Sequence, residues 1–406
     1  MTTLDATPKP FRLPFVAADW TAPGDLAGLQ RKALIAGAIG TVASLLGLFL
    51  NPPVFFRAYL VAWLLVVGVS VGCLAISMLH HLSRGAWGLM VRRPLEAAAR
   101  TIPLVGLLSI PIVLGIKQIF LWARPEVVAH DLMLQQKHWY LNVPFFIGRL
   151  IFYFVVWGGF GFVLDRLSRR QDEAPDPGLA RRMQLLAAPG LAIYCLLATF
   201  ASVDWLMSLQ PHWFSTIYGI YFIGGQGLAA LAFIILIALY LSRRAPMKQV
   251  LAPQHFHDYG KLFLAFVMLW AYFSFSQFLI IWAGNLPEEI IWYVRRIENG
   301  WGFLALSIVL FHFGMPFLLL LSRNLKRAPK RLGGLALFML FMRWVDLYWQ
   351  AEPAFHADNR FYFHWLFLTT LLAVGGIWLY AFCAELKKRP LLPINDPFLA
   401  EAVAHE

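Results

Sequence analysis

Ten long apolar stretches follow one another along the chain and occupy most of its length. They cover residues 33–50, 57–82, 99–122, 145–166, 184–204, 215–242, 261–283, 301–322, 333–350 and 361–385. About 20 apolar residues in a helix can cross the hydrocarbon core of a bilayer, and a helix satisfies its own backbone hydrogen bonds there. Since 60% of the residues are hydrophobic and 14% charged, the sequence predicts an all-α integral membrane protein with about ten transmembrane helices. A soluble globular fold is excluded.

The positive charges are distributed unevenly between the two sides of the predicted spans. Most of the 34 lysines and arginines lie in the N-terminal arm, in the C-terminal tail and in the loops after the second, fourth, sixth and eighth spans. Loops rich in Lys and Arg stay in the cytoplasm, which predicts a multi-pass membrane protein with cytoplasmic termini. The net charge of +12 then reflects topology, with contact to membrane lipids as a smaller part. Nucleic acid is not an expected partner.

A weak internal repeat relates the second to fifth spans to the sixth to ninth. Tyr59 and Tyr218 stand 159 residues apart, as do Gly68 and Gly227. At a shift of 142, "VDWLMSLQP" (203–211) matches "VDLYWQAEP" (345–353). Because four spans are an even number, both copies have the same orientation, which predicts two parallel-repeat four-helix bundles with two flanking helices.

These patterns divide the chain into six segments. The N-terminal arm among them lacks the apolar core of a cleaved signal peptide. The segments are a cytoplasmic arm (1–32), the first transmembrane helix and its outer loop (33–56), the first four-helix bundle (57–206), the second four-helix bundle (207–350), an outer loop with the tenth transmembrane helix (351–386) and a cytoplasmic tail (387–406).

The repeat places two acids in equivalent positions near the outer ends of the fifth and ninth spans. Asp204 and Asp346 each follow a valine, and Arg343 precedes Asp346 by one turn on the same helix face. Arg149, at the outer end of the fourth span, is another candidate partner. Ionisable groups within spans are costly and are commonly paired or functional. Each acid is therefore expected either to form a structural ion pair or to handle a ligand or a proton.

Aromatic residues surround both acids. Amphipathic aromatic rings are favoured at the level of the lipid headgroups, so an interfacial belt is the simplest interpretation. Its members are Trp205, Trp213, Tyr218, Trp344, Tyr348 and Trp349.

Three more polar side chains could extend a polar path from the outer face. Lys117, seven residues before Arg124, could snorkel to the headgroups or pair as a buried ammonium with a carboxylate of the fifth or ninth span. His212 lies in the outer loop after Asp204. His312 lies mid-span in "VLFHFGMPF" (309–317), where we expect a hydrogen-bonded core group or a member of a proton relay.

Motifs for redox centres are missing from the sequence. Cys73, Cys195 and Cys383 lie in apolar spans without C-x-x-C spacing, which excludes the usual iron–sulfur and covalent haem signatures. No pair of mid-span histidines on different helices is present to ligate haem b. We therefore expect no haem, iron–sulfur cluster or metal site in this chain.

Two long stretches carry a resemblance to a known family. "SVDWLMSLQPHWFSTIYG" (202–219) and "HDYGKLFLAFVMLWAYFSFSQFLIIWAGNLPEE" (257–289), with "WYVRR" (292–296), resemble the NrfD/polysulfide-reductase-like integral membrane subunits. The resemblance covers nearly the whole chain. It is nearest to the second such subunit of bacterial alternative complex III, a quinol:cytochrome c oxidoreductase.

The resemblance implies a membrane subunit of a respiratory or photosynthetic quinol:cytochrome c oxidoreductase, or of a complex with an equivalent periplasmic acceptor. Such a subunit would support quinone binding, proton translocation or both, with menaquinol or ubiquinol as the ligand. The redox centres would lie in its partners: an iron–sulfur protein, c-type cytochromes and a paralogous NrfD-like subunit.

The residues suggest where quinol protons could be accepted, although no catalytic residue is assigned. Oxidation of a quinol near the outer face requires a proton acceptor for each hydroxyl. Asp204 with His212, and Asp346 with Arg343, could serve, while Lys117, Arg149 and His312 would extend the path inward beside Trp205 and Tyr218. Two other functions stay open: a membrane anchor without a quinone site, and a secondary transporter, whose site would usually lie at the membrane midplane.

Overall fold

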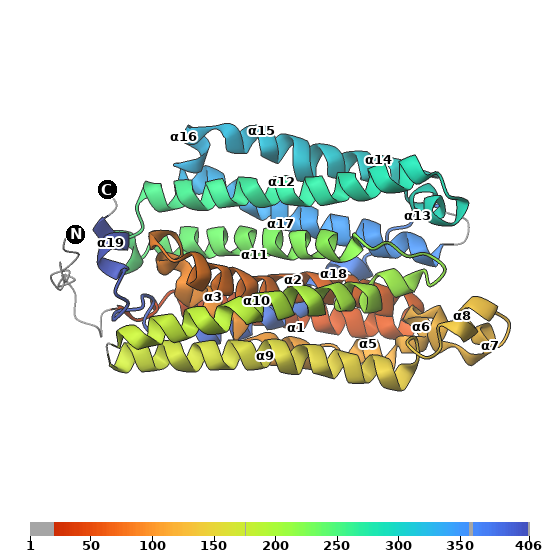
Figure 1. Cartoon of the computed structure of the whole chain (residues 1–406), viewed down its shortest axis with the longest axis horizontal. Coiled ribbons are helices and arrows are strands. Elements are labelled where there is room, and N and C mark those ends of the chain that lie inside the picture. Colours follow the sequence, from red (N-terminus) through yellow and green to blue (C-terminus); the bar gives the residue numbers. More distant parts are fainter. Residues whose placement is uncertain (1–19, 175, 357–359, 405–406) are drawn as a thin grey trace, which may run out of the picture.

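The computed structural model describes residues 20–174, 176–356 and 360–404, and within these ranges every regular element is a helix. Ten helical segments are long and apolar enough to cross a membrane. They run side by side along the long axis of the molecule (Figure 1). The prediction of an all-α fold with ten potential spans is confirmed.

The ten segments differ in continuity, and short helices connect them. The candidate spans are α1 (Leu26–Leu50); α2 (Pro52–Ser83); a broken third span of η2 (Ala86–Val91), α3 (Arg92–Ala99), α4 (Ile102–Leu107) and α5 (Ile110–Leu114); α9 (Val143–Glu173); α10 (Pro177–Trp205) with η4 (Met207–Leu209); α11 (Tyr218–Ser242); α12 (Pro253–Gly284); α14 (Trp301–Ile308) with a π-helical turn (Val309–Gly314) and α15 (Met315–Leu321); α17 (Pro329–Ala351) with η7 (Glu352–Phe355); and α18 (Leu366–Leu386). The connecting helices are α6 (Ile116–Ile119), η3 (Leu121–Ala123), α7 (Pro125–Val128), α8 (Leu132–Gln136), η5 (Met247–Gln249), α13 (Pro287–Ile297), α16 (Arg323–Lys326) and α19 (Leu399–Ala404).

The third span differs from the prediction. It covers Trp87–Leu114 rather than 99–122, and it is broken into short helices. Pro103 and Pro111 each lie in the first turn of a new helix, where a proline is tolerated because its missing N–H would have no helical partner. Residues 116–123 form α6 and η3 instead of completing the span.

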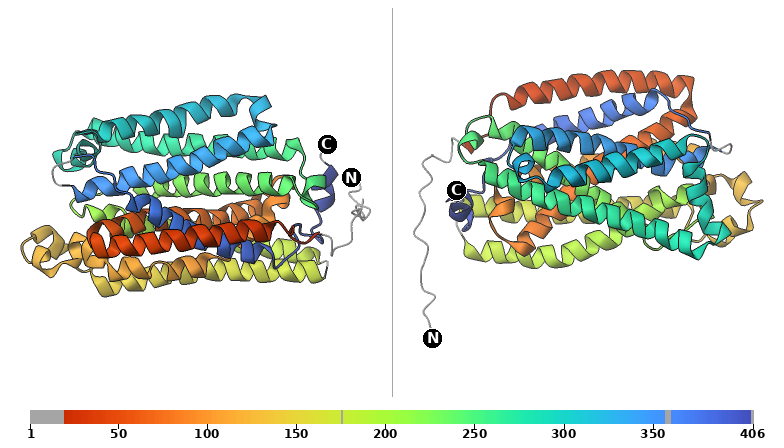
Figure 2. Two further views of the ribbon diagram at one scale, coloured as in Figure 1. Left: turned by 180° about the vertical axis from the view of Figure 1, so that it is seen from behind. Right: turned by 90° about the horizontal axis from the view of Figure 1, so that it is seen from above.

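The two ends of the helical bundle differ in what they carry. Helix α19 lies at one end, which we call the terminal end (Figures 1 and 2). Helices α6, α7, α8 and α13 lie at the opposite end, the loop end (Figure 1). Asp204 and Asp346 both lie near the loop end, because α10 and α17 finish there. The internal repeat and the cytoplasmic location of the terminal end stay predictions.

Helices α2 and α11 form the centre of the molecule. The most apolar window of α2 is completely buried and that of α11 is 83% buried, whereas only 22% of the α12 and α14 windows is buried. A helix that is apolar on all sides is suited to such a central position. Helix α11 packs against α2 and α10 on one side and against α12 and α17 on the other. It therefore connects the two groups of helices and brings Tyr218 and Tyr221 into the interior.

Candidate functional site

A buried ion pair on α17 forms the centre of the candidate site. Arg343 donates to Oδ2 of Asp346 one turn away, as expected, and the two side chains are 2% and 0% exposed. Two aromatic residues complete the shell: Tyr221 on α11 donates its hydroxyl to Oδ1 at 2.8 Å, and Trp270 on α12 donates its indole N–H to Oδ2 at 3.2 Å. Three helices thus hold the Asp346 carboxylate.

A hydrogen-bonded chain continues from this ion pair toward the loop end. Gln350 donates to the Tyr221 hydroxyl at 3.1 Å and accepts from the Tyr218 hydroxyl at 3.0 Å. Arg296 on α13 donates to the backbone carbonyl of Gln350 at 2.6 Å and to the Gln210 side chain at 2.9 Å. Burial lowers the pKa of Arg296 to about 9, because no carboxylate offsets the loss of its hydration. Helix α13 at the loop end is therefore connected to the Asp346 pair through polar contacts.

Gly225 on α11 makes room for the ion pair. A Cβ added at this position would overlap the guanidinium carbon and both terminal nitrogens of Arg343. Gly225 belongs to the glycine-rich sequence "GGQG" (224–227). It accommodates a buried charged side chain of a neighbouring helix.

An apolar cavity of about 640 Å³ lies directly beside this shell. Tyr221 and Trp270, which both bond to Asp346, line it, and so do Tyr293 and Ile297 of α13. Three further lining residues from α12 and the π-helical turn after α14 are largely exposed: Tyr272 at 64%, Phe275 at 60% and Val309 at 57%. The cavity, which we call the loop-end cavity, therefore opens sideways between these two helices.

His312 lies behind the cavity against Trp270, with ring centroids 4.2 Å apart. It is fully buried, and neither ring nitrogen has a hydrogen-bond partner among the described residues. The expectation of a hydrogen-bonded core histidine is therefore wrong. The chain around His312 forms a π-helical turn immediately before Pro316, as expected where a proline cannot donate to the preceding turn.

Asp204 occupies a different environment. Arg149 on α9 donates to it through Nε at 2.9 Å and Nη2 at 2.8 Å, and the Tyr153 hydroxyl donates at 2.7 Å. The expected partnership with Arg149 is confirmed. Trp205 is 1% exposed and its ring packs on Trp63, with centroids 4.7 Å apart. Aromatic rings fill the surroundings of Asp204, and its ion pair is structural in character.

Two predicted site residues lie away from both acids. The His212 side chain is 54% exposed, and its Nε2 lies 2.6 Å from Asp131 Oδ2, so it does not act together with Asp204. Lys117 is exposed on α6 at the loop end, beyond the third span. A buried pairing of Lys117 with a carboxylate is therefore excluded.

The prediction of an interfacial aromatic belt is wrong for the six residues assigned to it. All are 8% exposed or less, because they pack between helices rather than toward the headgroups. Depth along a span can be read from a sequence, but the direction in which a ring points depends on its neighbouring helices.

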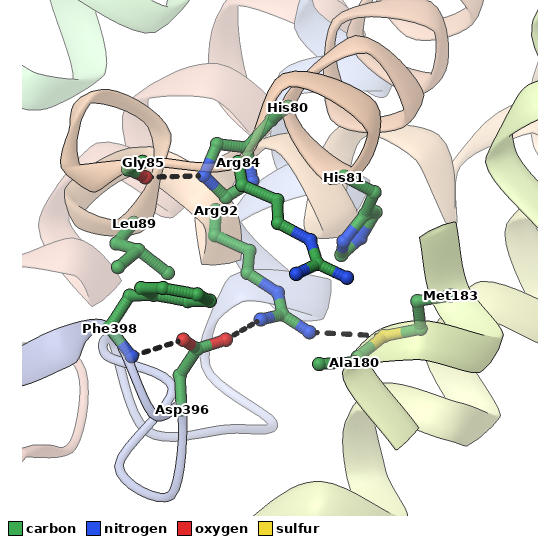
Figure 3. Close-up of a pocket in the computed structure, with 10 residues that line it drawn as sticks. All are labelled: His80, His81, Arg84, Gly85, Leu89, Arg92, Ala180, Met183, Asp396 and Phe398. Carbon is green, nitrogen blue, oxygen red and sulfur yellow. Dashed lines mark hydrogen bonds and ion pairs between the residues drawn. The ribbon is translucent and has the colours of Figure 1, made fainter. Parts of the chain in front are cut away.

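A charged network at the terminal end was missed by the sequence analysis. Glu96 accepts from Arg92 Nε at 2.9 Å and from Arg93 Nη1 at 2.6 Å, and all three side chains are 5% exposed or less. Arg92 also donates to Asp396 of the C-terminal segment at 2.7 Å (Figure 3). In "RRPLE" (92–96), Glu96 follows Arg92 by four residues and Arg93 by three, a spacing that allows ion pairs on one helix face. The positive charge of this loop alone had indicated only its side of the membrane. The adjoining cavity of about 30 Å³ is large enough for a water molecule only.

The described residues contain no group of three or more His, Cys, Asp or Glu side chains arranged to hold a metal ion. No protein-family model matches the sequence, and no curated protein matches it significantly. The fold and the site alone therefore define the class: an all-helical protein with ten potential membrane spans and a laterally open apolar cavity beside a buried ion pair.

Proposed function

We propose that the loop-end cavity binds a membrane quinol, and that the chain is a subunit of a quinol:electron-acceptor oxidoreductase. The observation that carries the proposal is the direct hydrogen bonding of two cavity-lining residues, Tyr221 and Trp270, to the buried Asp346. Electrons would pass to redox centres in partner subunits, namely an iron–sulfur protein and c-type cytochromes beside a paralogous NrfD-like subunit. The complex would lie in the bacterial inner membrane with the loop end on the periplasmic side.

The size and lining of the cavity support a quinol as the occupant. Cavities for small organic ligands usually measure about 300–1,000 Å³ and are apolar, with few polar groups. Here Ser274 and Tyr293 are among the few residues with polar side chains in an otherwise largely aromatic and aliphatic lining. A quinol diffuses within the bilayer, so a lateral opening between α12 and α14 matches its route of approach.

The Asp346 shell supports a role in accepting protons. Oxidation of a quinol releases two electrons and two protons, and each proton needs an acceptor within hydrogen-bond reach. Tyr221 lines the cavity and its hydroxyl is bonded to Asp346, so this residue connects the cavity to a buried carboxylate. Gln350 and Tyr218 extend this connection toward the loop end. In this proposal Arg149 and Asp204 form a scaffold, because aromatic rings fill the space around them.

Quinone binding to the purified protein in lipid nanodiscs tests the proposal. Decylubiquinone and menaquinone-4 serve as probes, with tryptophan fluorescence quenching as the measurement. Ala305 lines the cavity, and Ala305→Phe should weaken binding at least tenfold by filling it. Leu306, the next residue, is 55% exposed and does not line the cavity, so Leu306→Phe is the matched control.

Equal affinity of both variants and the unchanged protein would show that quinone does not occupy this cavity. Complete absence of binding in the unchanged protein would favour the membrane anchor without its own quinone site.

A further inference from the structure

A second large cavity lies at the terminal end, between the last turn of α11 and the first turn of α17. Its volume is about 560 Å³, and its lining consists of Leu239, Ser242, Arg243, Ala328, Pro329, Lys330 and Arg331. We call it the basic groove. It lies where two candidate spans end, since α11 finishes at Ser242 and α17 begins at Pro329.

The charges of the basic groove are not neutralised by the protein. Arg243, Lys330 and Arg331 are exposed, and none forms an ion pair or a side-chain hydrogen bond among the described residues. No acid lines the groove. The neighbouring segments 243–261 and 323–331 carry nine lysines and arginines but only one acid, Asp258, which is bonded to Lys261 at 3.0 Å.

The excess of positive charge near the basic groove also affects Lys326. Lys326, between α15 and α17, is 7% exposed, and burial together with the charges of Lys261 and Arg323 lowers its pKa. An anion bound at this end would reduce the repulsion among these cations. The groove is therefore electrostatically complementary to a negatively charged ligand.

The surface beside the groove is apolar and extends along α17. Lys330, Gly334, Leu337 and Phe341 follow each other at intervals of three or four residues, so they lie on one face of the helix. All four are exposed, Leu337 at 59% and Phe341 at 50%, and no atom lies within 4 Å of a Cβ added at Gly334. An exposed apolar strip on α17 thus continues from the basic groove toward the middle of the span.

We infer that the basic groove and this strip form a binding site for an anionic phospholipid. The phosphate would lie among Arg243, Lys330 and Arg331, and an acyl chain would cover Leu337 and Phe341. A free phosphate or a nucleotide would use the three cations but not the strip. Basic pockets between helix ends on the cytoplasmic side are suited to anionic headgroups, and the site is independent of the quinol site at the opposite end.

Native mass spectrometry of the full chain, released from nanodiscs, tests this site. Phosphatidylglycerol and phosphatidylcholine are the lipid probes, and inorganic phosphate is the probe for a free anion. The variant Arg243→Gln/Lys330→Gln/Arg331→Gln removes the headgroup contacts. The control Arg181→Gln/Arg182→Gln/Lys248→Gln removes the same charge from exposed residues outside the groove.

The groove variant should retain phosphatidylglycerol at least about tenfold less than the control, since each basic residue near an anionic lipid contributes roughly fivefold. A second variant, Leu337→Gln/Phe341→Gln, should reduce phosphatidylglycerol retention without changing the binding of inorganic phosphate. All substituted residues are exposed, so the melting temperature should stay unchanged.

Three results would overturn the inference. Equal loss of phosphatidylglycerol in the groove variant and its control would indicate a general charge effect. Equal retention of phosphatidylcholine and phosphatidylglycerol by the unchanged protein would exclude headgroup recognition. Binding of inorganic phosphate with no effect of the strip variant on phosphatidylglycerol would assign the groove to a free anion.

Discussion

Arg149 holds Asp204 from a neighbouring helix through two hydrogen bonds, from Nε to Oδ2 at 2.9 Å and from Nη2 to Oδ1 at 2.8 Å. A bidentate pair of this kind is among the strongest charge-assisted contacts in proteins. Arg343 instead reaches Asp346 within one turn and through one nitrogen, which leaves Oδ1 of Asp346 to the cavity residue Tyr221. Asp204 and Asp346, which the predicted repeat places in equivalent positions, thus differ in their surroundings: Asp204 joins helices, and Asp346 is bonded to residues that line a cavity.

Asparagine at each acid separates these two roles. Asp204→Asn and Asp346→Asn each leave a buried guanidinium without its counter-charge, which costs about 3–5 kcal/mol, so both should lower the melting temperature of the detergent-purified protein. Only Asp346→Asn should also weaken quinone binding, by at least about tenfold, because only Asp346 orients the cavity residues. Equal loss of quinone affinity in both variants would mean that the effect is one of general stability.

Alanine at Gly225 on α11 should disrupt the Arg343–Asp346 ion pair on the neighbouring helix α17. The added methyl would overlap the Arg343 guanidinium, so Gly225→Ala should destabilise the protein by about 1–3 kcal/mol and weaken quinone binding. Gly159 on α9 has no atom within 4 Å of an added Cβ, and Gly159→Ala should leave stability unchanged or raise it slightly. Thermal unfolding monitored by tryptophan fluorescence measures both. Identical melting curves for the two variants would contradict the packing of Arg343 on Gly225.

Phenylalanine at position 312 should stabilise the isolated protein. His312 buries two ring nitrogens without partners, and an unsatisfied buried polar group costs about 1–3 kcal/mol. His312→Phe keeps a ring beside Trp270 and removes that cost, so the melting temperature should rise. A clear fall in melting temperature would show that the imidazole is needed for the packing of the π-helical turn.

The docking of the loop-end segment that contains α8 should weaken at acidic pH. Hydrogen bonds from the Leu134 backbone N–H and from His212 hold the pKa of Asp131 below its usual range. A depressed pKa in the folded state means that this contribution is complete above the unfolded-state pKa of about 3.9 and is lost as the pH falls through the lower folded value. Hydrogen exchange at Met133 and Leu134, corrected for intrinsic rates, should therefore accelerate below about pH 4.

Asp131→Asn is the matched control for this pH dependence. Asparagine is also a good N-terminal helix cap, but it does not titrate in this range. The variant should therefore show the same corrected exchange rate across the acidic range. A pH dependence that persists in Asp131→Asn would place the responsible group elsewhere.

The sequence was sufficient to predict those features that depend on position along the chain. Ten apolar stretches require ten helices, because a lipid environment offers no other partner for the backbone. The Arg343–Asp346 pair follows from helical spacing. The third span was predicted at 99–122, whereas the observed span, Trp87–Leu114, includes the charged residues Arg92, Arg93 and Glu96. In the folded chain these two arginines are paired with Glu96 and with two acids of distant segments, Asp172 and Asp396.

The tertiary structure decided everything that depends on which helix faces which. Tyr221 and Trp270 are unremarkable aromatic residues in the sequence, and only the packing of α11 and α12 against α17 brings them to Asp346. In the same way, His212 is only eight residues from Asp204 in the sequence, but its side chain lies against Asp131 of a distant segment at the loop end. A long apolar stretch is enough to predict a membrane helix. The partners of its few polar groups depend on side-chain contacts between segments that are distant in the sequence. The sequence alone therefore determined a ten-helix membrane fold with two notable acids, and the packing of the helices determined that one acid is enclosed and the other adjoins a cavity.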